Sequence, residues 1–179
     1  MVKPKICFSL VLYKHTLSLI APLLESIASF SQSEDGFQIF LSVYDGSPLG
    51  FPSPSQKQLS SLLPCVNVRL VQGNNIGFGR GNNLNFFQAD LSSHDLFVVV
   101  NPDISFSAQC ILPVVHWLLS SSSYSCVAPL IFLEDGAIQY SAKQNPTVLS
   151  LLLGRFGFLL HVPGLRRYDA WHLSLIHIS

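Results

Sequence analysis

The feature that most constrains this fold is a series of short apolar runs, each of which ends directly in a polar or glycine-rich cluster. Runs with little alternation are typical of strands that are buried on both faces of a parallel sheet. The segments between them carry apolar residues at helical spacing, as at Leu19, Leu23 and Ile27. Alternating strands and helices predict an α/β fold, with a mostly parallel sheet flanked by helices and joined by right-handed crossovers.

The individual elements can be placed from these patterns. The expected strands cover residues 5–12, 37–44, 66–71 and 96–100, with a further strand near 125–131. The expected helices cover 17–30, 56–63, 108–119 and a segment that starts in the glycine-rich loop and ends near 89. A hairpin is expected through 134–137, where an Asp-Gly pair favours a tight turn.

Composition narrows the classes of partner. The 179 residues contain ten basic and ten acidic side chains, so no net positive field attracts a phosphate backbone, and we expect no nucleic-acid partner. Charged residues make up 11% of the chain, against ~25% in an average soluble domain. This shortage predicts either an apolar neighbour or a longer natural protein. No run reaches the ~20 apolar residues of a membrane-spanning helix, but the apolar segment 148–165 is a candidate for peripheral membrane contact.

The four cysteines are widely spaced and form no Cys-x-x-Cys pair. This spacing indicates neither a disulfide framework nor a zinc site. We therefore expect buried free thiols of a cytoplasmic protein at all four positions, which are Cys7, Cys65, Cys110 and Cys126.

Polar side chains gather at the carboxyl ends of the expected strands, where open parallel sheets bind their ligands. Tyr13 follows the first strand, Asp45 the second, the glycine-rich loop 73–83 the third and Asp103 the fourth. Two acids, several amides and such a loop at one edge favour a nucleotide with a diphosphate. The loop alone is a weak signal, because it reads Gly-x-Gly-x-Gly and does not fit the Gly-x-Gly-x-x-Gly dinucleotide motif after a first strand.

Each of these side chains has two interpretations. Asp103 could hold a divalent cation that neutralises a diphosphate, or it could be an N-cap or turn residue. Asp45 could accept a hydrogen bond from a base N–H or a ribose hydroxyl, or it could simply begin an Asp-Gly turn. Tyr13 is also compatible with an ordinary solvent-exposed strand end. Spacing alone leaves these alternatives open.

Five motifs occur in a family order: Ser9-Leu-Val-Leu-Tyr-Lys, Val43-Tyr-Asp-Gly-Ser, Asn75-Ile-Gly-Phe-Gly-Arg-Gly-Asn-Asn, Val99-Val-Asn-Pro-Asp and the segment 129–141. Together they resemble glycosyltransferase family 2, in particular its rhamnosyltransferase-like bacterial members that build surface polysaccharides. The resemblance covers about residues 5–168. It implies a GT-A fold, a nucleotide-sugar donor, a divalent metal (Mg²⁺ or Mn²⁺) and an inverting, single-displacement reaction.

The resemblance also implies a nucleotide-sugar site made of Tyr13, Asp45, Asn75, Gly77, Asn83 and Asp103. In it, Asp45 matches the acid that recognises the nucleoside, and Asp103 matches the last acid of the metal motif. Three residues depart from the family pattern, because Tyr44 and Gly46 replace the usual neighbours of Asp45 and Asn85 stands where glycine is common. These departures leave the identity of the donor open.

The catalytic base is left unassigned. The family's base is an acid on a later helix, whereas Glu134-Asp135 matches an earlier hairpin. We expect 1–145 to form the donor-binding half and 146–172 to begin an acceptor-side region, with the base beyond the chain. The last seven residues, 173–179, resemble the translation of a transposon end used in sequencing libraries, and we leave them out of the fold prediction.

The hypothesis that results is a cytoplasmic glycosyltransferase, at the inner face of the plasma membrane. It would transfer a sugar such as rhamnose from a dTDP- or UDP-linked donor to a saccharide or a lipid-linked acceptor. A non-catalytic nucleotide-binding fragment is one alternative. An NAD(P)-dependent oxidoreductase is a second alternative, disfavoured because no dinucleotide motif follows the first strand.

Overall fold

The computed structural model describes residues 3–33, 36–129, 131–133, 136 and 138–139. The chain divides into two compact units, residues 1–125 and 126–179, and each is described by itself. The strands of the first unit are β1 (Lys5–Leu12), β2 (Gln38–Asp45), β3 (Asn67–Gln72) and β4 (Leu96–Val100). Its helices are α1 (Leu17–Ser33), α2 (Gln56–Leu62), α3 (Phe78–Gln88) and α4 (Ala108–Ser120).

The four strands form one sheet in the order β3-β2-β1-β4, and every neighbouring pair is parallel. This confirms the predicted α/β fold with a parallel sheet flanked by helices. All eight elements predicted for this unit are present, and α1 extends past its predicted end at residue 30 to Ser33.

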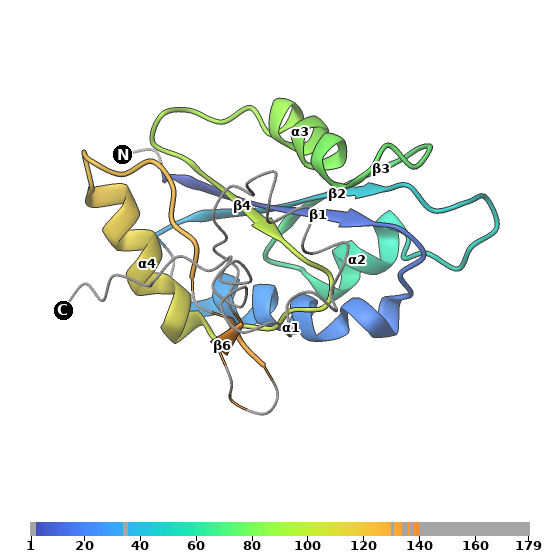
Figure 1. The fold of residues 1–179 in the computed structure, drawn as a ribbon, viewed down its shortest axis with the longest axis horizontal. Helices are drawn as coiled ribbons and strands as arrows, with labels where there is room; N and C mark the ends of the chain where they lie inside the picture. The colour runs from blue at the N-terminus through green and yellow to red at the C-terminus, as the bar shows by residue number, and fades with distance from the viewer. Residues whose placement is uncertain (1–2, 34–35, 130, 134–135, 137, 140–179) are drawn as a thin grey trace, which may run out of the picture. The chain divides into compact units, whose positions relative to one another are not determined.

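The helices are divided between the two faces of the sheet. α3 lies on one face, and α1, α2 and α4 lie on the other (Figure 1). Successive side chains of β1 point to opposite faces of the sheet, as the pleat of a strand requires. Phe8 packs edge-on against Phe30 of α1, with ring centroids 5.6 Å apart, whereas Ser9 donates a hydrogen bond to Asn82 of α3.

The strand register determines where the chain leaves the sheet. Leu12, Asp45 and Gln72, the last residues of β1, β2 and β3, are register partners and lie at one level. β4 ends earlier, because its last residue, Val100, pairs with Leu10. β2 and β3 lie on one side of β1, and β4 lies on the other, so the direction in which the chain adds strands reverses at β1. Open parallel sheets bind ligands where this direction reverses, beyond the carboxyl ends of their strands.

The second unit contains a short antiparallel hairpin of β5 (Ile131–Phe132) and β6 (Ile138–Gln139), which confirms the predicted hairpin. Gly136 in its turn has φ +80°, a conformation that glycine adopts without strain. The predicted strand near 125–131 is wrong over residues 125–129, which are not in a strand. An apolar run forms a strand only where a partner accepts its hydrogen bonds, and Pro129 lacks the N–H that a ladder needs.

Three predictions concern residues outside the described part of the chain. These are the roles of Glu134-Asp135, the acceptor-side and membrane-contact segments within 146–172, and the segment 173–179. Among the helices that the structure does describe, none combines the length and the apolar character needed to cross a membrane.

The cysteines are all free, as predicted, but only Cys7 is buried. The prediction of burial is wrong for Cys65, Cys110 and Cys126, which are exposed. Cys7 lies within β1, at the centre of the sheet, whereas Cys65 lies in the turn between α2 and β3. Whether a cysteine is buried therefore depends more on its position in the fold than on the apolar character of its thiol.

Candidate functional site

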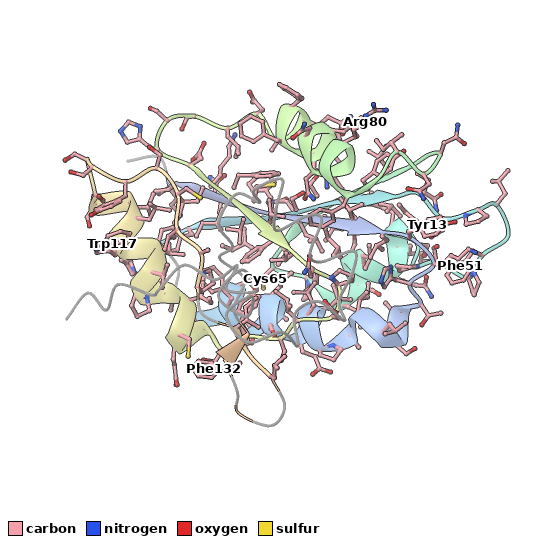
Figure 2. All side chains as sticks on the ribbon, in the orientation of Figure 1. Tyr13, Phe51, Cys65, Arg80, Trp117 and Phe132 are labelled. Atoms are coloured by element: carbon pink, nitrogen blue, oxygen red, sulfur yellow. The ribbon has the colours of Figure 1, made fainter. Side chains whose placement is uncertain are left out.

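The carboxyl edge of the sheet contains a pocket of about 630 Å³. The end of β1 and the loops that follow β2 and β3 form its walls, and they contribute Tyr13, Asp45, Phe51, Gln72 and Asn75. Tyr13 and Phe51 lie near each other at this edge, far from Trp117 of α4 (Figure 2). The pocket lining therefore combines aromatic rings with polar side chains, which suits a planar polar ligand.

Asp45 is the acid of this pocket and is almost completely buried, with 2% of its surface exposed. Its Oδ1 accepts a hydrogen bond from the backbone N–H of Ser47 at 3.0 Å. Its Oδ2 is 3.5 Å from the side-chain nitrogen of Gln72, the residue beside it in the strand register. Because this second contact is long, Oδ2 can accept a further hydrogen bond from a ligand.

The loops after β2 and β3 approach each other closely beside the pocket. The hydroxyl of Tyr44 donates to the carbonyl oxygen of Asn74 at 2.6 Å, and the N–H of Gly73 donates to the carbonyl oxygen of Asp45 at 3.0 Å. A Cβ atom at Gly46 would lie 3.0 Å from the Cα of Asn75. This close approach explains why position 46 accommodates glycine and leaves little room for a side chain.

The glycine-rich loop turns into α3 at Gly77, whose φ of +82° is unfavourable for other residues. Asn75 stabilises this turn, because its Oδ1 accepts a hydrogen bond from the N–H of Gly77 at 3.0 Å. α3 begins without a side-chain cap. Its first N–H groups therefore have no side-chain partner from the capping residue and carry the positive end of the helix dipole.

The structure brings together half of the predicted site residues. Tyr13, Asp45 and Asn75 line the pocket, whereas Gly77, Asn83 and Asp103 do not. Asn83 is exposed on α3, and Asp103 is exposed in the loop that follows β4. Arg80, another polar residue of the glycine-rich segment, lies on the side of α3 that faces away from the sheet (Figure 2).

Two amides are buried between α3 and the sheet, a packing role that sequence reasoning assigned to neither of them. Asn85 is completely buried and donates to Ser9 Oγ and to the carbonyl oxygen of Ser42, at 3.0 Å each. Asn82 accepts a hydrogen bond from Ser9 Oγ at 2.6 Å. Positions 82 and 85 share one face of a helix, and this spacing is the signal that could have separated them from Asn83.

Gln72 and Phe51 were also missed as residues of the pocket. Gln72 ends β3 as the register partner of Asp45, so the parallel pairing of β2 with β3 is the signal that places it. Phe51 lies in the loop after β2, where no strand register applies, and nothing in its local sequence marks it as part of a site.

A divalent metal at this edge would need ligands in addition to the described side chains. The described residues contain no group of three or more His, Cys, Asp or Glu side chains that could hold a metal ion. Mg²⁺ is commonly held by one or two carboxylates together with substrate phosphates and water. The exposed carboxylate of Asp103 fits that kind of site as a single protein ligand. The diphosphate would then supply most of the ligands that do not come from the protein.

No protein-family model matches this chain, and no curated protein matches it either. The resemblance to glycosyltransferase family 2 therefore stays a prediction that depends on the motifs. The pocket beside Asp45 provides a second, independent basis for a functional proposal.

Proposed function

We propose that this chain binds the nucleoside diphosphate of a nucleotide-sugar, as the donor-binding part of an inverting glycosyltransferase. The observation that carries the proposal is the buried Asp45 carboxylate, which faces a pocket of about 630 Å³ with one oxygen still able to accept a hydrogen bond. A buried carboxylate is costly unless hydrogen bonds compensate it, so a ligand N–H or O–H donor is a favourable partner. The volume lies within the roughly 300–1,000 Å³ of small-molecule sites.

The pocket suggests an orientation for the ligand. The base lies against Tyr13 and Phe51 and donates a hydrogen bond to Asp45. The diphosphate extends toward the start of α3, where N–H groups without a side-chain cap favour an anion. Asp103 would supply a carboxylate ligand to Mg²⁺ or Mn²⁺, and the cation would stabilise negative charge on the diphosphate leaving group.

In the proposed reaction, a hydroxyl group of a saccharide or lipid-linked acceptor attacks the anomeric carbon of the sugar. Its proton passes to a carboxylate base, and the bond between the sugar and the diphosphate breaks. A non-catalytic nucleotide-binding role predicts binding without this step. Because no base is assigned within this chain, we expect it on its own to bind the donor without transferring the sugar. Acceptor-dependent release of nucleoside diphosphate from dTDP- or UDP-sugars would therefore exclude a purely non-catalytic role, whereas binding alone fits both roles.

The binding proposal is tested by calorimetric titration of uridine, thymidine, UDP and dTDP into the parent chain and Asp45→Asn. Asparagine retains an acceptor for the Ser47 N–H and replaces the second oxygen by a donor. We expect about tenfold or greater weakening for nucleosides and nucleotides alike, since a hydrogen bond to a charged group is lost. An effect restricted to phosphate-bearing ligands would show that Asp45 does not contact the nucleoside.

The metal site is tested separately with Asp103→Asn. We expect weaker UDP binding in Mg²⁺, unchanged UDP binding in EDTA and unchanged uridine binding throughout. Asp90→Asn is the matched control, because Asp90 is also an exposed acid and lies just beyond α3. Equal UDP affinities of Asp103→Asn and the control in Mg²⁺ would remove the metal role and leave the role of Asp45 intact.

A further inference from the structure

We infer that Tyr44 is a positioning residue, whose hydroxyl holds the loop 73–77 in the place that gives the pocket its shape. Tyr44 itself does not line the pocket. Its effect on the loop follows from contacts alone, whereas its effect on ligand affinity rests on the proposed function.

Tyr44 is enclosed between segments that are far apart in the sequence. Only 5% of its surface is exposed, and its hydroxyl donates to the carbonyl oxygen of Asn74 at 2.6 Å. A Cβ atom at Gly73 would lie 2.6 Å from this hydroxyl oxygen, and one at Gly81 would lie 3.3 Å from Cδ1 of the ring. The ring therefore occupies space that two glycines leave open.

The position of Asn74 is transmitted to the pocket through the next residue. Asn75 lines the pocket, and its backbone lies close against Gly46 in the loop that follows Asp45. Asn75 also accepts the N–H of Gly77, where α3 begins. A shift of the Asn74 carbonyl would therefore move both the part of the pocket that Asn75 lines and the start of α3.

Tyr44 and Asp45 divide two tasks between neighbouring positions of β2. Successive side chains of a strand point to opposite faces, so Tyr44 lies on the α3 side and Asp45 on the other. Ligand recognition and loop positioning are therefore separable by mutation. Substitution of Tyr44 changes the loop without removing any group that the proposed ligand contacts.

The first test removes only the hydroxyl, in Tyr44→Phe of the full chain. Amide hydrogen exchange is measured for residues 73–77 and for α1, together with UDP affinity in Mg²⁺. We expect about tenfold faster exchange in the loop, a several-fold weaker affinity for UDP and unchanged exchange in α1. Tyr124→Phe is the matched control, because Tyr124 is 55% exposed and lies outside the pocket.

The second test uses the close approach of Gly73. In the parent, Gly73→Ala places a methyl group 2.6 Å from the Tyr44 hydroxyl oxygen. This distance is a steric clash, so the ring or the loop must move. In Tyr44→Phe, the nearest ring atom is 3.4 Å away, an ordinary contact. We expect Gly73→Ala to lower the urea midpoint clearly in the parent and far less in Tyr44→Phe, so that the two substitutions are not additive.

The outcomes separate the two proposals. Unchanged loop exchange in Tyr44→Phe, or strictly additive effects with Gly73→Ala, would overturn the positioning role of Tyr44 even if the parent binds UDP. Absence of UDP binding by the parent would overturn the proposed function, whereas exchange and the mutant cycle would still decide whether Tyr44 holds the loop.

Discussion

The two faces of the sheet are held by chemically different contacts. On the face covered by α1 and α4, the rings of Phe8, Phe30 and Phe106 lie within a continuous apolar core. On the face covered by α3, the buried contacts include hydroxyl and amide groups, such as Ser9 and Asn85. Burial of apolar surface stabilises a fold without specifying direction, whereas hydrogen bonds are directional and specify position. The α3 face therefore contributes mainly to the placement of the glycine-rich loop.

The α3 face also shows that its polar contacts are not arranged for maximum stability. Asn85 Nδ2 lies within hydrogen-bond distance of three oxygens, which belong to Ser9, Leu10 and Ser42. Asn85 Oδ1 and Ser42 Oγ, in contrast, are buried and have no protein partner among the described residues. Buried polar atoms of this kind cost free energy. The comparison thus predicts large stability losses on the apolar face and smaller losses on the α3 face.

The largest loss is expected for Phe8→Ala on the apolar face. Phe8 is 1% exposed and contacts Phe30 and Phe106, so truncation leaves a cavity between β1, α1 and the segment that precedes α4. We expect a decrease of about 3–5 kcal/mol in the free energy of unfolding. Urea denaturation followed by circular dichroism measures it, and a loss below about 1 kcal/mol would contradict the proposed difference between the faces.

A smaller loss is expected for Asn85→Ala on the α3 face. The substitution removes the donors to Ser9 and Ser42, and we expect a decrease on the order of 2 kcal/mol in the free energy of unfolding. Asn83→Ala is the matched control, since Asn83 is exposed on the same helix and should change stability by no more than ~0.5 kcal/mol. Equal effects at the two positions would mean that the buried amide does not hold α3.

A pH-dependent loss is expected from Cys7, which lies on the α3 face of β1. Burial raises the pKa of the Cys7 thiol from 9.0 to about 11, against a smaller opposite effect of the Ser42 backbone N–H. Between these values the folded protein keeps a proton that the unfolded chain releases, so stability falls as pH rises above 9 and is unaffected by Cys7 below it. From pH 8 to pH 10, we expect the parent to lose about 1 kcal/mol more than Cys7→Ala. Parallel stability curves for the two proteins would contradict this.

The same contrast explains how much could be predicted from the sequence. The apolar face was predictable, because apolar residues at strand and helix periodicity identify buried surfaces without further information. The position of Asp45 at the pocket was predictable too, since the carboxyl ends of parallel strands share one edge. Asn82 and Asn83 carry the same side chain, and only the rotation of α3 against the sheet makes one buried and the other exposed. That rotation depends on packing between elements, which a local pattern does not contain.

The smallest effect is expected at Gly79, and its comparison with Gly81 tests the packing of α3 most finely. A Cβ atom at Gly79 would meet nothing within 4 Å, whereas one at Gly81 would lie 2.8 Å from Cγ2 of Val11. Alanine within a helix limits the freedom of the unfolded chain, so Gly79→Ala should stabilise the protein by about 0.4–1 kcal/mol. Gly81→Ala brings the same gain but forces α3 away from β1, and overpacking of this kind costs about 1–3 kcal/mol. The two substitutions should therefore shift the urea midpoint in opposite directions. A gain at both positions would show that α3 is free to move away from the sheet. In that case the buried hydrogen bonds of Asn85 would not determine the distance between α3 and the sheet.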